Sequence, residues 1–230
     1  EFAVTNLMAW SPDSEYLTYV RFDESEVPEY SMQMWGNGLY PGYYNFKYPK
    51  AGEKNSKVTV HSYSVATKDI KELKVPVEGD YYIPRITFTT NSDQLAVMTL
   101  NRQQNVFNMY YVNPKSGVSR LILRDENKCY VDSEWLTSIH FNPSGFTYVS
   151  EQDGYSHIYL YSPTGVMQRQ VTKGNWDVTR LIGYDDATKV VYYESAEESP
   201  LRRSVYKIDQ KGVKTKLSEG EGTNSADFSA

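Results

Sequence analysis

The chain has 230 residues and a mass of 26.5 kDa, with 24 basic and 29 acidic side chains, three histidines and one cysteine. The net charge of -5 argues against nucleic-acid binding, which normally needs a basic surface. One cysteine cannot form an internal disulfide, and the sequence has no Cys/His spacing typical of a zinc site. It also has no apolar run of about 18 residues, the length that spans a membrane. We therefore expect a globular chain without a membrane span, metal or other cofactor.

Composition and periodicity point to β-structure. Tyrosine occurs 21 times, and tyrosine, valine and threonine favour the pleated, half-buried surface of a strand. Few segments place apolar residues at helical spacing. The sequence therefore predicts an all-β fold. The chain also begins without an initiator methionine or a signal-peptide pattern, so we expect Glu1 to be a cut end.

A repeat runs along the chain. Similar segments, each an aromatic opening followed by a turn and an alternating strand, begin near Trp10, Phe88, Phe141 and Tyr184, and a further opening lies near Phe228. Their separations are 78, 53, 43 and 44 residues. Repeats of about 40–50 residues with four short strands are typical of β-propeller blades. We predict a β-propeller fragment of about four four-stranded antiparallel blades plus the start of another. The alternative is a β-sandwich with accidental spacing.

The first separation is too long by about 30 residues for a single blade. The surplus falls at about 27–55, a segment rich in Tyr, Met, Gly and Pro that also holds a Trp. Such composition is typical of an interaction surface. Two interpretations remain: a long loop folded back over its own blade, or an extended arm that contacts a partner subunit, which we favour. The predicted organisation is one partial propeller domain over 1–230 with this arm inserted in the first blade.

Sequence motifs for catalysis are missing. No Gly-x-Ser-x-Gly elbow, His-Glu-x-x-His, phosphate loop or Gly-x-Gly-x-x-Gly occurs. The titratable candidates are His61, His140, His157, Cys129, Asp185-Asp186 and Glu197-Glu198. We expect the histidines to pack or to form hydrogen bonds, the cysteine to be inert and the acidic pairs to lie in solvated turns. These residues alone support a scaffold or binding module.

Several segments, in order along the chain, resemble the propeller of the dipeptidyl peptidase IV family. They are Trp10-Ser11-Pro12-Asp13, the run 21–30, Tyr48-Pro49-Lys50-Ala51-Gly52 with Asn55, Tyr82-Ile83-Pro84-Arg85, Asp153-Gly154-Tyr155 with His157, and the run 171–178. The sequence resembles that of a bacterial, Bacteroides-type member of the family. Prolyl tripeptidyl peptidases share much of this propeller.

The resemblance implies a serine exopeptidase that removes N-terminal dipeptides whose second residue is Pro or Ala. Its Ser-His-Asp triad lies in a C-terminal α/β-hydrolase domain, so we expect no catalytic residue in this chain. The propeller would recognise the substrate N-terminus, gate access and form a homodimer. The implied partners are peptide substrates, the hydrolase domain and a second subunit, and the implied location is the periplasm or the cell surface.

The resemblance also implies residue roles. The family binds the substrate α-ammonium with a Glu-Glu motif, and spacing to Trp10 places Glu1 at its last Glu; the alternative is a cloning remnant. Trp135 corresponds to a Trp near the substrate pocket, but residues 136–141 lack the family's Gly-Arg-Phe-Arg, and core packing is the alternative role. The residues expected at the dimer contact are Tyr30, Met32, Met34, Trp35 and Tyr48.

Three other identities remain open from the sequence. The chain could be a stand-alone propeller that binds proteins, the propeller of a prolyl tripeptidyl peptidase, or part of an inactive homologue. The first differs from the peptidase hypothesis in having no downstream Gly-x-Ser-x-Gly elbow.

Overall fold

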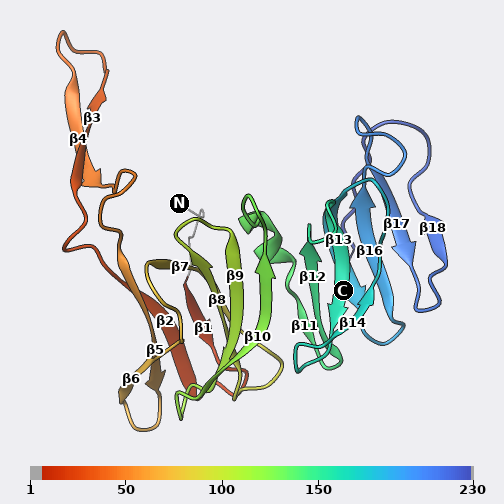
Figure 1. Ribbon diagram of the computed structural model, residues 1–230, viewed down its shortest axis with the longest axis horizontal. Helices are drawn as coiled ribbons and strands as arrows, with labels where there is room; N and C mark the ends of the chain where they lie inside the picture. The colour runs from red at the N-terminus through yellow and green to blue at the C-terminus, as the bar shows by residue number, and fades with distance from the viewer. Residues whose placement is uncertain (1–6, 229–230) are drawn as a thin grey trace.

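The computed structural model describes residues 7–228, and within them the chain is almost entirely β-structure. Four four-stranded antiparallel sheets stand side by side along the molecule (Figure 1). Each sheet uses strands that are consecutive in the chain, apart from the inserted hairpin in the first. This succession of four sheets confirms the predicted propeller fragment, since a sandwich would consist of two sheets.

The strand bounds follow the predicted repeat. Blade 1 contains β1 (Met8–Trp10), β2 (Tyr16–Asp23), β5 (Lys57–Ser64) and β6 (Ile70–Leu73). Blade 2 contains β7 (Tyr81–Phe88), β8 (Leu95–Asn101), β9 (Val106–Val112) and β10 (Ser119–Glu126). Blade 3 contains β11 (Phe141–Asn142), β12 (Gly145–Ser150), β13 (His157–Tyr161) and β14 (Met167–Gln170). Blade 4 contains β15 (Val178–Asp185), β16 (Val190–Ser195), β17 (Ser204–Ile208) and β18 (Lys214–Lys216).

The aromatic openings of the repeat lie in the first strand of each blade. Trp10 ends β1, Phe88 ends β7, Phe141 begins β11 and Tyr184 lies near the end of β15. A turn then reverses the chain into the second strand. The fifth predicted opening has no strand within the described residues, but the Phe228 ring lies 4.8 Å from that of Tyr192 in blade 4.

The core consists of three apolar layers between neighbouring blades. One buried cluster lies between blades 1 and 2, a second between blades 2 and 3, and a third between blades 3 and 4. The side chains of β8 from Leu95 to Leu100 are all buried, because this inner strand is covered on both faces. Each blade is therefore stabilised mainly by its neighbours, as expected for stacked repeats.

One glycine is required by this packing. Gly145 starts β12 with a φ of 143°, and a Cβ there would lie 1.8 Å from the carbonyl oxygen of Tyr161. No side chain can occupy that space without moving β13.

The inserted segment forms a two-stranded hairpin, which we call the arm: β3 (Glu29–Met34) pairs with β4 (Gly42–Lys47). It projects away from blade 1 at one end of the sheets (Figure 1). All six residues of β3 are exposed, and five of the six residues of β4. The structure therefore confirms an extended arm, and the fold-back interpretation is wrong.

In the part of the chain that the structure describes, helix is confined to one 3-10 element, η1 (Ser133–Ser138), between blades 2 and 3. No helix within residues 7–228 is long and apolar enough to cross a membrane.

Candidate functional site

The arm has two chemically different faces. Side chains alternate along a strand, so Tyr30, Met32 and Met34 of β3 share one face with their cross-strand partners Phe46 and Tyr44. Their rings are in contact: the centroid distance is 5.7 Å for Tyr30 and Phe46 and 5.4 Å for Tyr44 and Phe46. We call this set the apolar face of the arm.

The opposite face of the arm is mainly polar. It carries Ser31, Gln33 and Asn45, with a 2.5 Å hydrogen bond between the Ser31 hydroxyl and the Asn45 side-chain oxygen. At the tip, Trp35 is 75% exposed and Leu39 is 94% exposed. A lone two-stranded hairpin is marginally stable in water, and exposed apolar patches mark interaction sites. The arm therefore presents a surface suited to a partner.

Tyr48, also predicted at the dimer contact, lies beyond β4 at the base of the arm. Its ring centroid is 6.0 Å from those of Tyr30 and Phe46. The structure thus places the five predicted arm residues in two groups: four on the hairpin and its tip, and one at the base.

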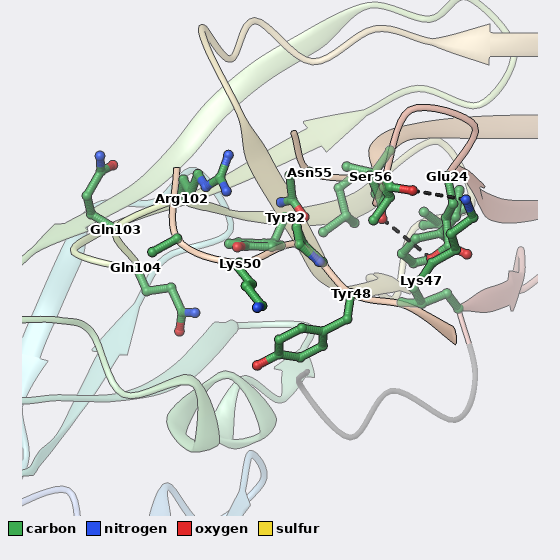
Figure 2. A pocket seen from close by; sticks show the side chains of 18 of the residues that line it. Glu24, Lys47, Tyr48, Lys50, Asn55, Ser56, Tyr82, Arg102, Gln103 and Gln104 are labelled. Atoms are coloured by element: carbon green, nitrogen blue, oxygen red, sulfur yellow. Dashed lines mark hydrogen bonds between the residues drawn. The ribbon is translucent and has the colours of Figure 1, made fainter. Parts of the chain in front are cut away.

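A cavity of about 1260 Å³ lies at the base of the arm, between blades 1 and 2 (Figure 2). Its apolar wall includes Val20, Phe22, Val58 and Ile83. Its polar lining comes from the end of β4 and the segment after it, from the chain that follows β2 and that precedes β5, and from the β8–β9 turn. Sequence reasoning missed this cavity, because its walls come from segments far apart in the chain.

The charged lining of the cavity is mostly cationic. The Lys47 ammonium donates to the Val27 carbonyl oxygen at 3.0 Å, and Arg102 forms a 2.9 Å ion pair with Asp80. The Lys50 ammonium lies 5.6 Å from the Tyr30 ring centroid, at cation–π distance. Among the described residues, the one lining carboxylate is that of Glu24.

Trp135 lies in η1 at the same end of the blades as the arm (Figure 1). It is half-buried and packs against the core layers on both sides of blade 3, while its buried Nε1 has no hydrogen-bond partner among the described residues. These contacts describe a packing residue. A role toward substrate remains a prediction.

The η1 loop is held by Arg85, from the Tyr82-Ile83-Pro84-Arg85 motif. Its Nη1 donates to the carbonyl oxygens of Leu136 at 2.6 Å and Ile139 at 3.2 Å. Burial lowers the pKa of this guanidinium. The side chain joins blade 2 to the loop that carries Trp135. The motif identified Arg85 in the sequence, but the sequence did not indicate which carbonyl groups Arg85 binds.

The other titratable candidates have structural partners. His157 is fully buried, and its ring nitrogens lie 3.1 Å from the Thr172 hydroxyl and 2.9 Å from the Gly174 carbonyl oxygen. The His61 ring stacks on Tyr19 at 5.4 Å. His140 is exposed and lies just before β11, outside the strands, and Cys129 is exposed too.

The acidic pairs lie beside lysines. Asp186 pairs with Lys189 at 2.5 Å, and Glu198 pairs with Lys216 at 2.9 Å. Asp185 accepts hydrogen bonds within its own turn. Within residues 7–228, no group of three or more His, Cys, Asp and Glu side chains could hold a metal ion. Glu1, the predicted α-ammonium ligand, lies outside the described residues.

The four stacked blades, with an arm inserted in the first, define the chain as a fragment of a β-propeller. The family profile described as "Dipeptidyl peptidase IV (DPP IV) N-terminal region" matches residues 1–230. The chain belongs to this family and corresponds to its N-terminal region.

Named relatives agree with this assignment. Dipeptidyl peptidase 4 of Arthroderma otae is 31% identical over 238 residues, covering 96% of this chain. The crystal structure of Porphyromonas gingivalis dipeptidyl peptidase 4 covers the whole chain at 60% identity with a TM-score of 0.93. A putative dipeptidyl aminopeptidase IV from Bacteroides ovatus covers 93% of it at 25% identity with a TM-score of 0.75. The chain spans 30% of the Arthroderma protein and 33% of each solved chain.

Proposed function

We propose that this chain is the propeller part of a serine exopeptidase that releases X-Pro and X-Ala dipeptides from the N-termini of peptides. The observation that carries the proposal is the 60% identity, over the whole chain, to a structure described as a dipeptidyl peptidase 4. The catalytic Ser-His-Asp triad would belong to a hydrolase domain outside these 230 residues. The propeller would contribute recognition of the substrate N-terminus and control of access.

Dimerisation is the second proposed role, and the arm supports it. The apolar face of the arm is exposed, although Met and aromatic side chains of this kind are enriched in the cores of interfaces. A second copy of the protein would cover this face. We further propose a periplasmic or cell-surface location, which cell fractionation would test.

Kinetics on the whole protein test the peptidase proposal. Gly-Pro-p-nitroanilide should be cleaved far faster than Ala-Ala-Pro-p-nitroanilide, and acetylation of the substrate amine should abolish cleavage, because the free α-ammonium is the proposed recognition element. Residues 1–230 alone should cleave neither. A preference for the Ala-Ala-Pro substrate would instead identify a tripeptidyl peptidase, and no cleavage of either would identify an inactive homologue.

A further inference from the structure

The charge of the cavity at the base of the arm is opposite in sign to that of the chain. The chain carries 29 acidic and 24 basic side chains, yet the charged side chains that line the cavity within residues 7–228 are Lys47, Lys50 and Arg102 against the carboxylate of Glu24. We infer that this cavity binds an acidic side chain of a peptide substrate. The inference rests on the proposed peptidase function.

Two of the three cations are not neutralised by carboxylates. Within residues 7–228, Arg102 pairs with Asp80, whereas no carboxylate lies within ion-pair distance of the ammonium of Lys47 or Lys50. Lys47 is held by a backbone carbonyl and Lys50 by an aromatic ring. Both interactions leave the full positive charge in place, so the cavity would attract an anionic group from solvent.

The shape and the remaining lining favour a peptide over a small free anion. Pockets for drug-sized ligands measure about 300–1,000 Å³, so about 1260 Å³ can accept several residues of an extended chain. The apolar wall would contact peptide side chains, from which a free anion gains nothing. Asn55, also in the lining, has a buried Nδ2 that makes no hydrogen bond among the described residues, and a small rotation would let it donate to a peptide carbonyl.

The test uses the whole protein and a set of Gly-Pro peptides in which one Asp moves through positions three to eight. Each is compared with the same peptide carrying Asn. We expect kcat/KM to be about two- to five-fold higher for Asp at one or two adjacent positions, the range for a solvent-exposed ion pair. The ratio should fall toward one in 0.5 M salt.

Three variants assign this preference to the cavity. Lys50→Gln should lower the Asp/Asn ratio, and Glu24→Gln, which removes the opposing charge, should raise it. Lys211→Gln is the matched control, since this exposed lysine lies in the β17–β18 turn at the opposite end of the blades, and it should leave the ratio unchanged. Both Lys50 and Glu24 are exposed, so neither change should impair folding.

Failure of the inference is distinguishable from failure of the proposed function. Cleavage of the Asn peptides measures the peptidase function by itself. Fluorescence anisotropy of fluorescein-labelled Asp and Asn peptides measures the charge preference without catalysis. Equal affinity for the two peptides, or a preference that Lys50→Gln leaves intact, would overturn the inference even in an active peptidase. A preference for the Asp peptide that is lost in Lys50→Gln would support the inference even if the protein is an inactive peptidase.

Discussion

Tyrosine hydroxyls packed between the blades should make the fold unstable at alkaline pH. Burial raises the pKa of both Tyr111 and Tyr161 to about 12, above the usual value of about 10. Their side chains are only 6% and 7% exposed. In the unfolded chain both hydroxyls would ionise near pH 10, whereas in the folded protein they stay protonated until about pH 12.

The sign and size of the effect follow from these values. Because the folded pKa is the higher one, this stabilisation is fully present below pH 10 and is lost as the pH rises through 12. One pKa unit corresponds to about 1.36 kcal/mol, so each tyrosine forfeits about 2.7 kcal/mol across that window. At pH 11 each would already have lost about half of it.

Tyr161→Phe isolates one of these groups. The Tyr161 ring stacks on Phe146 at 5.1 Å, and phenylalanine keeps that contact while removing the hydroxyl. Urea unfolding followed by circular dichroism from pH 8 to 11.5 should show a variant whose unfolding free energy falls less steeply, by about 1 kcal/mol per pH unit between pH 10 and 11.5.

Val149→Ala is the control for plain loss of packing, since Val149 is fully buried in β12 and does not titrate. It should lower stability equally at every pH, by about 2 kcal/mol. If the wild-type and Tyr161→Phe curves run parallel through pH 10–11.5, the reasoning from burial is refuted.

Three further predictions concern the packing of the blades. Gly145→Ala should cost more than 3 kcal/mol or prevent folding, because its Cβ would overlap a carbonyl oxygen. Gly154→Ala is the control and should cost about 1 kcal/mol, because Gly154 has a φ of 99° but open space around it. Equal shifts of the two variants in thermal melts would refute this reasoning. Arg85→Met should lower stability by about 2 kcal/mol and expose the η1 loop to proteolysis, with partial rescue by Arg85→Lys; an unchanged digestion pattern would argue against the loop contact. His157→Leu should cost about 2–3 kcal/mol in urea unfolding, because it removes the buried contacts of both ring nitrogens, to the Thr172 hydroxyl and the Gly174 carbonyl oxygen. A neutral effect would show that these contacts are dispensable.

The fold could be predicted because its signals are local. The first strand of each blade carries an aromatic residue close to the turn that follows, as at Phe88 and Phe141, and these features lie within a few residues of one another. The arm was predictable because it interrupts the spacing of the repeat between Trp10 and Phe88. The sequence left two interpretations, a loop folded back over its own blade and an extended arm. The structure decides between them because β3 and β4 lie in solvent.

The site could be predicted only in part, because its contacts are long-range. Arg85 donates to a carbonyl oxygen 51 residues later in the chain, and no local pattern encodes that distance. His157 finds its hydroxyl partner 15 residues away, across β13 and β14. The cavity joins segments of blades 1 and 2 that meet only after the sheets have stacked. Backbone carbonyls and cavity walls leave no recognisable pattern in the sequence. The sequence therefore showed the motif that contains Arg85 but not the role of this side chain.

We propose that this propeller serves a dimeric peptidase through its arm. The most direct test is sedimentation equilibrium of the whole protein with Met32→Ser/Met34→Ser on the apolar face of the arm, against Ser31→Ala/Gln33→Ala on the polar face. We predict a wild-type dimer, an unchanged dimer for the polar-face variant and a dissociation constant at least about 100-fold higher for the apolar-face variant, because each change occurs twice in a symmetric interface. An apolar-face variant that dimerises as tightly as the wild type would contradict the account.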